Sequence, residues 1–130
     1  MRVYLDASAA SKLLIEEAES APLKRELDEW TETGAATVSC ILLETELRRV
    51  AVRNGIDQSK VNDVLAGVDL LDLDRGLFRT AGLLPGRHLR SLDALHVAAA
   101  VRLAADVFLS YDDRQAAAAE AAGLRVLAPS

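Results

Sequence analysis

Two short apolar runs, Val3-Tyr4-Leu5 and Val107-Phe108-Leu109, are each followed closely by an acidic residue, Asp6 after the first and Asp112 after the second. Continuous apolar runs of this length are typical of strands buried in a parallel sheet. Two more acids lie in the first turns of helix-like segments: Glu46 and Asp93. Because strand carboxyl ends and helix N-termini share one edge of a parallel α/β sheet, we expect these four carboxylates to converge on one site. Converging carboxylates repel each other unless a divalent cation lies between them, so the pattern predicts a metal-dependent enzyme.

The rest of the chain alternates between strand-like and helix-like segments. We expect strands over residues 2–5, 37–40, 68–73, 106–110 and 124–127, and helices over residues 8–17, 20–33, 41–53, 57–67, 74–83, 92–104 and 114–122. Four polar residues are expected to cap helix N-termini: Ser20, Asp57, Asp74 and Ser91. This alternation predicts one α/β domain over residues 1–130, with a parallel sheet and helices on both of its faces.

Composition places the chain among globular proteins. Hydrophobic residues make up 51% and charged residues 27% of the 130 positions, a balance that excludes a disordered chain. Cys40 is the only cysteine, which excludes an internal disulfide and a cysteine-cluster zinc site and favours a reducing compartment. No apolar run approaches the ~20 residues of a membrane span, and Asp6 and Lys12 interrupt any signal-peptide core. We therefore expect a cytoplasmic protein without membrane contact.

The distribution of charge is more informative than the net charge of −5. Asp93 is the only acid between Arg75 and Arg102, a stretch that also contains Arg79, Arg87, His88 and Arg90. A second basic group follows Glu46: Arg48, Arg49 and Arg53. Basic patches around an acidic centre suit an enzyme that acts on phosphodiesters, but arginines on solvated helix faces would give the same pattern. The candidates for RNA contact are Arg49, Arg87 and Arg90.

Four segments carry the acids in order along the chain: VYLDASA (residues 3–9), VSCILLETELRR (residues 38–49), SLDALHVAAA (residues 91–100) and FLSYDDR (residues 108–114). Together they resemble the motifs of PIN-domain nucleases, and the length of the chain is similar to that of the compact toxin branch, the ribonucleases of VapBC-type toxin–antitoxin pairs. Cys40 departs from this pattern because it stands where the family has a small hydroxyl residue. The resemblance covers the whole chain.

The resemblance implies a three-layer PIN-like domain with a parallel sheet in the order 3-2-1-4-5. It implies a ribonuclease that uses Mg2+, with Mn2+ as a substitute, to activate a water against an RNA phosphodiester. Asp6 and Asp93 would be direct metal ligands, and Glu46 a ligand through water or an orienter of the nucleophile. Asp112 would bind a second metal or position a water. Ser8 and Ser110 would support these acids through hydrogen bonds.

The same resemblance implies partners. The substrate would be tRNA, rRNA or mRNA, and the sequence does not choose between them. A cognate VapB-type antitoxin would neutralise the enzyme. Early helices that include Leu27 and Trp30 would form the antitoxin groove and contribute to a homodimer, although core packing would also explain these two side chains.

Each acid also has a structural explanation. Asp6, Asp93 and Asp112 could stabilise helix N-termini without a metal, and Asp113 could replace Asp112 as the fourth acid. Glu46 could form an ion pair with Arg49. The alternative function is therefore a catalytically inactive PIN-like module that binds RNA or protein. Two other α/β classes with an acidic pocket are disfavoured, because no Asp-x-Asp follows the first strand, as haloacid-dehalogenase-type phosphatases require, and no lysine follows Lys60, as response-regulator receiver domains require.

The two histidines are not expected to catalyse proton transfer. His96 lies three residues after Asp93 on one helix face, so an Asp-x-x-His metal pair is conceivable, but its apolar surroundings favour a core or interface histidine. His88 is expected to be exposed in a loop. A metal-activated water is therefore the favoured mechanism over a histidine acid–base pair.

Overall fold

The computed structural model describes all residues 1–130 and contains five strands and seven helices. The strands are β1 (Arg2–Leu5), β2 (Ala36–Cys40), β3 (Asp69–Leu71), β4 (Val107–Leu109) and β5 (Val126–Leu127). The helices are α1 (Ala7–Leu14), α2 (Ser20–Glu32), α3 (Leu42–Asn54), α4 (Gln58–Ala66), α5 (Arg75–Gly82), α6 (Ser91–Arg102) and α7 (Asp113–Ala121). Every predicted element exists, although several are shorter than expected.

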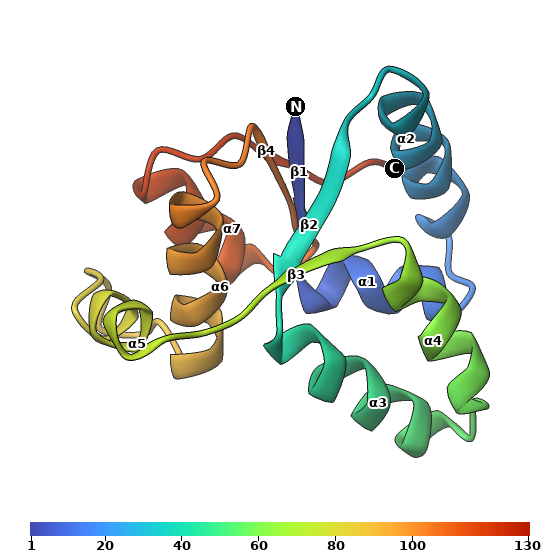
Figure 1. The fold of residues 1–130 in the computed structure, drawn as a ribbon, viewed down its shortest axis with the longest axis horizontal. Helices are drawn as coiled ribbons and strands as arrows, with labels where there is room; N and C mark the ends of the chain where they lie inside the picture. Colours follow the sequence, from blue (N-terminus) through green and yellow to red (C-terminus); the bar gives the residue numbers. More distant parts are fainter.

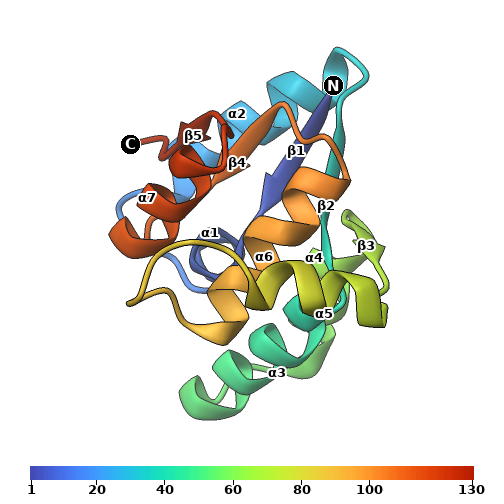
Figure 2. The same cartoon turned by 90° about the vertical axis from the view of Figure 1, so that its left-hand side faces the viewer.

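All strand pairs are parallel, and the order of the strands is β3-β2-β1-β4-β5. The predicted sheet order is therefore confirmed. Figure 1 shows the sheet between two groups of helices, with α5, α6 and α7 on one face and α1 to α4 on the other. Figure 2 shows the first group in front of the strands. The expected three-layer α/β domain is thus confirmed.

The alternation of side chains along β1 divides the core into two parts. Val3 and Leu5 are buried on the side of α1 to α4, where the core includes Leu23, Leu43 and Leu47. Tyr4 points to the opposite face, where it packs with Phe108 and with the buried residues of α6. Successive strand residues point to opposite faces, so a strand with helices on both sides must be apolar at every position.

α6 is the most buried helix because it lies between the sheet and the helices α5 and α7. All residues from Ala94 to Ala100 are buried. Small alanine side chains allow this close approach of backbones, and the three larger residues of the stretch, Leu95, His96 and Val97, are buried as well. The alanine run of the sequence is therefore a packing feature.

Two of the predicted helix caps are wrong. Ser20 lies inside α2 rather than before it, and its hydroxyl donates to the carbonyl oxygens of Lys12 and Ile15. Ser91 is the first residue of α6, and the residue before it, Arg90, caps the helix without a side-chain hydrogen bond. The predicted caps Asp57 and Asp74 are confirmed, since each accepts a hydrogen bond from the first turn of its helix.

Two residues of α2 that the sequence indicated as a possible antitoxin-binding edge contribute to the core. Leu27 and Trp30 of α2 pack, partly buried, against the core that contains Leu23. Core packing therefore accounts for at least part of the surroundings of both side chains.

No helix of the protein combines the length and the apolar character that a bilayer crossing requires.

Candidate active site

Asp6 lies at the carboxyl end of β1, where the chain turns into α1. Its Oδ1 atom accepts hydrogen bonds from the backbone N–H of Ala9 at 2.9 Å and from the hydroxyl of Ser8 at 2.7 Å. The residue is buried, and burial raises the pKa of its carboxyl, against hydrogen bonds from Ser110 and Ser8 that lower it. The hydrogen bonds from Ala9 and Ser8 both end on Oδ1, so capping of α1 leaves Oδ2 open to another partner.

Two serines connect the ends of the neighbouring strands β1 and β4. The Ser8 and Ser110 hydroxyl oxygens lie 3.4 Å apart, and Ser8 Oγ accepts the backbone N–H of Tyr111 at 2.9 Å. The loop after β4 is therefore fixed against the start of α1. This arrangement places both serines in the surroundings of Asp6, where the sequence predicted supporting hydrogen bonds.

Asp93 and Asp112 line a pocket of about 520 Å³ at the start of α6 and α7. Asp112 caps α7, because its Oδ1 accepts the backbone N–H groups of Arg114 at 2.9 Å and Gln115 at 3.0 Å. Asp93, in the first turn of α6, has no hydrogen-bond partner for its side chain. Asp113 lines the same pocket, and both acids are exposed, but only Asp112 is fixed by hydrogen bonds to the first turn of α7.

The environment of Asp93 disfavours a negative charge. Burial raises the pKa of its carboxyl, and the negative charges of Asp112 and Glu46 raise it further, while His96 and Arg90 act in the opposite direction. Like charges within reach of one another disfavour ionisation. The carboxylate of Asp93 thus lacks the donors that would satisfy it, which is the state in which a bound cation gives the largest gain.

Glu46 reaches the site from α3 and is held by His96 of α6. The Nε2 atom of His96 lies 2.6 Å from Glu46 Oε1. The predicted alternative for Glu46, an ion pair with Arg49, is absent, and the ion pair of this helix joins Arg48 to Glu44 at 3.6 Å. His96 is 1% exposed, so the core interpretation of this histidine is confirmed.

The ring of His96 has polar neighbours on its other side as well. Its Nδ1 lies 2.8 Å from the hydroxyl of Tyr4 and 3.6 Å from the thiol of Cys40. Burial by itself lowers the pKa of His96, but the hydrogen bonds to Cys40 and Glu46 outweigh it and raise the pKa to about 10. Four elements (β1, β2, α3 and α6) therefore meet at one imidazole ring.

The residues present fit a hard divalent cation with few direct protein ligands. No group of three or more His, Cys, Asp or Glu side chains surrounds a single point, so the four acids do not form a closed cage. Mg2+ needs only one or two carboxylates, because it keeps several of its waters. Asp93 has both oxygens without a partner and Asp6 has Oδ2, which is the donor chemistry that such an ion requires.

A larger basic groove adjoins the acidic pocket. It has a volume of about 980 Å³ and lies between the loop at residues 85–90 and α7. Its charged residues are Arg87, Arg90 and Arg114, and Ala117, Ala118 and Ala121 form an apolar wall. Arg90 and Arg114 line both this groove and the acidic pocket. His88 is exposed, as expected, and also lines the groove.

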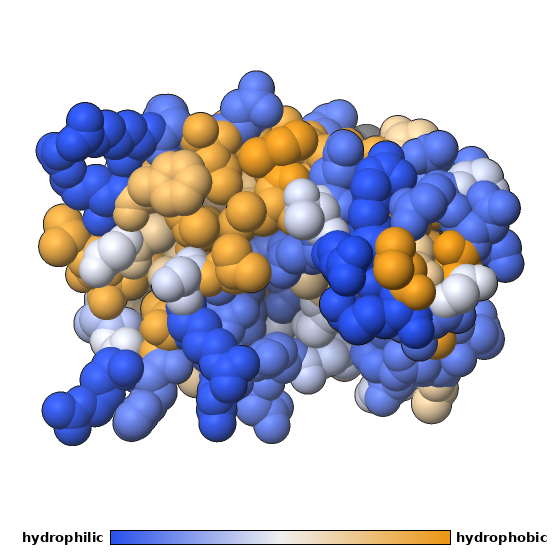
Figure 3. Space-filling view, turned by 90° about the horizontal axis from the view of Figure 1, so that it is seen from below, coloured by the Kyte–Doolittle hydropathy of each residue, from blue (hydrophilic) through white to orange (hydrophobic).

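The structure separates one predicted RNA contact from the others. Arg49 is exposed on α3 and lines neither the groove nor the acidic pocket. Figure 3 views the molecule from the end to which the carboxyl ends of the strands point. Apolar surface is gathered there on the side of α5. Arg114 was missed in the sequence, because its place directly after two acids gives no sign that the start of α7 brings it to the pocket that Asp93 lines.

The contact between His96 and Glu46 was also missed. The sequence did contain a signal, since the Asp-x-x-His spacing puts Asp93 and His96 on one face of α6. The partner of His96 could not be identified, because Glu46 lies on another helix. Only the fold brings α3 and α6 to the same edge of the sheet.

Comparison with known proteins agrees with this geometry. Residues 3–121 match the model of the PIN domain family. The chain is 40% identical to Ribonuclease VapC46 of Mycobacterium tuberculosis over 98% of both chains. It is 38% identical to Ribonuclease VapC35 of the same species, over 98% of this chain and 96% of the relative.

Solved structures show the same fold at lower identity. The toxin–antitoxin complex VapBC2 of Rickettsia felis, bound to a DNA fragment from its promoter, contains a chain with a TM-score of 0.77 and 12% identity, with full coverage of both chains. VapC20 of Mycobacterium tuberculosis, described as a toxin that cleaves the sarcin–ricin loop, gives a TM-score of 0.73 at 17% identity over 98% of this chain and 99% of that one. With the family match over most of its length and relatives at these identities, the chain belongs to the PIN-domain family and, within it, to the VapC ribonucleases.

Proposed function

We propose that this protein is a divalent-metal-dependent endoribonuclease that acts as the toxin of a toxin–antitoxin pair. The observation that carries the proposal is the state of Asp93. Its carboxylate is partly buried, has no hydrogen-bond donor, and lies within reach of the negative charges of Asp112 and Glu46. Such an arrangement costs stability unless a cation compensates it, and folds retain costly polar groups mainly where they serve a function.

In this proposal, Asp6 and Asp93 hold the cation, with Mg2+ as the ion and Mn2+ as its substitute. Asp6 Oδ1 remains the cap of α1 and is oriented by Ser8, so its free oxygen has a fixed direction. Asp112 supports the site from the start of α7, either at a second ion or through a water. A cation bound there would supply the charge that lowers the pKa of an attacking water and offsets charge developing on the phosphate.

The substrate would enter along the basic groove. Arg87, Arg90 and Arg114 can contact phosphate oxygens on either side of the scissile bond, and the last two border the acids directly. Phosphate contacts by guanidinium groups provide affinity without sequence selection. An open groove that passes the site also suits cleavage inside a chain rather than at its end. Arg49 would contact RNA only beyond this groove.

The partners are proposed from the family and from the surface. Two of the similar chains of known structure come from VapBC and FitAB structures, so we expect a VapB-type antitoxin to bind this protein. We also expect a homodimer. Large hydrophobic side chains are exposed on α5, directly after it and at the start of α6, and a monomer gains nothing from exposing them: Phe78, Leu83 and Leu92.

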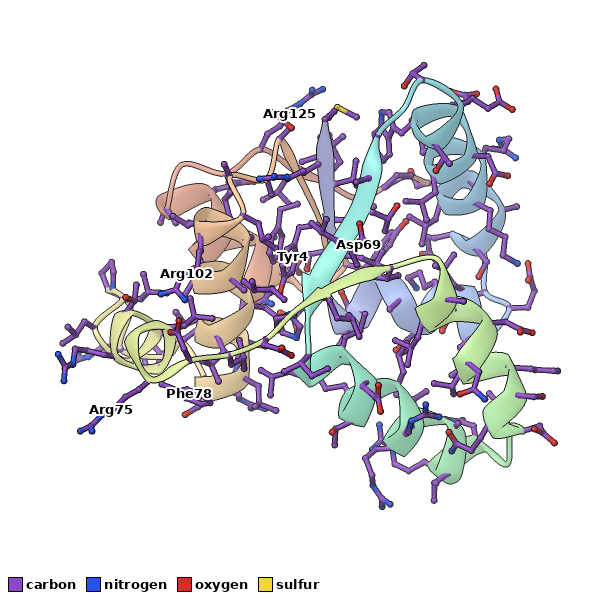
Figure 4. The ribbon with its side chains drawn as sticks, viewed as in Figure 1. Tyr4, Asp69, Arg75, Phe78, Arg102 and Arg125 are labelled. Atoms are coloured by element: carbon purple, nitrogen blue, oxygen red, sulfur yellow. The ribbon has the colours of Figure 1, made fainter.

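The test is incubation of antitoxin-free protein with total cellular RNA, with and without Mg2+ or Mn2+. We expect discrete fragments that require the metal and that disappear in the variants Asp6→Asn and Asp93→Asn. An Arg125→Ala variant is the matched control, since Figure 4 places Arg125 at the opposite end of the sheet. Absence of fragments from folded wild-type protein would instead favour the inactive RNA- or protein-binding module.

A further inference from the structure

Glu46 depends on a single contact for its orientation. The hydrogen bond to His96 at 2.6 Å is the only one that its carboxylate makes. The side chain is partly exposed, at 21%, and lies on the second turn of α3 with no basic neighbour paired to it. A glutamate side chain has three rotatable bonds, so without that contact its carboxylate would sample several positions.

The imidazole of His96 is itself held rigidly. The Tyr4 hydroxyl and the Cys40 thiol contact Nδ1, and the Tyr4 ring meets the imidazole edge-on, with centroids 5.8 Å apart and an angle of 79°. Tyr4 is fully buried and stacks on Phe108 at 5.2 Å. Figure 4 shows Tyr4 on the side of β1 that faces α6. The ring is therefore anchored to the centre of the sheet.

The direction of the hydrogen bond follows from the chemistry of the partners. A carboxylate can only accept, so the proton between the two residues belongs to Nε2 of His96. The donor points from the core toward the site edge, and its acceptor is one of the four predicted acids. The charge of His96 also acts on Asp6 and Asp93. The hydrogen bond therefore satisfies a buried donor and at the same time holds the carboxylate of Glu46.

From this geometry we propose that His96 is a positioning residue: its Nε2–H group, anchored through Tyr4 and Cys40, fixes the Glu46 carboxylate in the orientation that serves the metal site. This inference rests on the proposed function, because it assumes that Glu46 contributes to the reaction. The orientation of the Glu46 carboxylate would then depend on α6 and the sheet as much as on α3. Groups that orient metal-site carboxylates typically contribute 10–100-fold to metal affinity or activity.

Matched substitutions separate positioning from packing. In His96→Gln the amide nitrogen can take the place of Nε2 and donate to Glu46, whereas in His96→Asn it lies nearer the Tyr4 side and cannot reach. We expect His96→Asn to lose about 10–100-fold in kcat with little change in KM, and to bind Mn2+ more weakly in EPR titrations of the RNA-free protein. His96→Gln should recover most of both losses.

A double-mutant cycle tests whether His96 acts through Glu46. In a Glu46→Ala background, His96→Asn should cause no further loss, because its target is absent. The inference is overturned if His96→Asn lowers only the melting temperature, if His96→Gln is as impaired as His96→Asn, or if the loss persists in the Glu46→Ala background. An inactive wild-type protein would contradict the proposed function instead, so the two failures are distinguishable.

A further variant covers the case in which His96→Asn does not fold. Glu46→Asp keeps the charge at a partly exposed position but shortens the side chain by one methylene, so the carboxylate can no longer hold both the His96 contact and its place at the site. We expect this folded variant to lose about 10–100-fold in kcat and part of its Mn2+ affinity. Wild-type activity and Mn2+ affinity in Glu46→Asp would overturn the inference.

Discussion

At the scale of single residues, the proposed site contains carboxylates with unequal surroundings. Asp6 and Asp112 each use one oxygen to cap a helix, so they satisfy local structure and remain available at the other oxygen. The carboxylate of Asp93 caps no helix. The predicted conflict between helix cap and metal ligand is therefore not a real alternative for Asp6 and Asp112, since one carboxylate can do both.

For Asp93→Asn we predict a gain in thermal stability and a loss of RNA cleavage. Asp93→Asn removes a partly buried charge that Asp112 and Glu46 repel, so the metal-free variant should melt at a higher temperature than the wild type at neutral pH. The same change should reduce RNA cleavage by more than about a hundredfold, beyond the usual effect of an indirect ligand. Thermal unfolding in EDTA and cleavage assays in Mg2+ measure the two effects. Asp113→Asn, at an exposed neighbouring position, should change neither.

Arg114 provides a second test at this scale, because it borders both the acidic pocket and the basic groove. Arg114→Ala should raise KM for RNA several-fold and reduce the dependence of log KM on log salt by about one phosphate contact. Titrations at several salt concentrations measure this slope. Arg125→Ala is the control of equal charge. Equal slopes for Arg114→Ala and the wild type would remove Arg114 from the RNA path.

At the scale of elements, the sequence predicted the existence of strands and helices better than their beginnings. Asp57 and Asp74 were predictable caps because they precede helical segments directly, and carboxylates accept N–H groups of the first turn. Ser20 and Ser91 were not, because a serine hydroxyl serves equally well as a donor to carbonyl groups or as the first helical residue. Local sequence cannot decide between these uses; the path of the chain between α1 and α2 decides it for Ser20.

The start of α5 gives a prediction that depends on pH. The backbone N–H of Leu77 and the guanidinium of Arg102 hold the pKa of Asp74 below its ordinary value of 3.8. A carboxyl whose pKa is lower in the folded state than in the unfolded state stabilises the fold fully at pH values above its ordinary pKa. This contribution to stability is lost as the pH falls through the pKa of the folded state. Asp74→Ala should therefore melt at a lower temperature than the wild type at pH 7, and the difference should shrink toward pH 3.

Circular dichroism melts at both pH values measure this difference. Asp72→Ala, an exposed acid two residues earlier without a hydrogen bond, should melt like the wild type at each pH. A constant difference between Asp74→Ala and the wild type across the range would mean that the cap does not depend on the ionised carboxylate.

At the scale of the whole molecule, the order of strands and the two-sided core could be anticipated, because buried parallel strands must be apolar on both faces, as Val3, Tyr4 and Leu5 are. The contacts around the proposed site could not be anticipated. His96 and Glu46 are separated by fifty positions in the chain, and Arg114 lines the same pocket as Asp93 only because α6 and α7 begin at the same edge. Such pairs depend on helix rotation and on the crossing of elements, which one sequence does not encode locally.

The exposed apolar surface of α5 and α6 leads to the last prediction. Two copies that each carry a net charge of −5 repel each other, so an uncharged apolar surface favours their contact, and Phe78 (52% exposed), Leu83 (78%) and Leu92 (49%) provide one. Phe78→Glu combined with Leu83→Glu would place four added charges at a two-fold contact. Light scattering should then give about twice 14.0 kDa for the wild type and 14.0 kDa for the variant.

The fold of each copy should survive this change, because exposed substitutions usually alter stability by no more than about 0.5 kcal/mol. Val52→Glu, at a similarly exposed hydrophobic residue of α3, is the matched control and should keep the wild-type mass. A wild type of 14.0 kDa at high concentration would refute the dimer. A dimer that persists in the double variant would place the contact elsewhere, and Val52→Glu would then show whether α3 forms it.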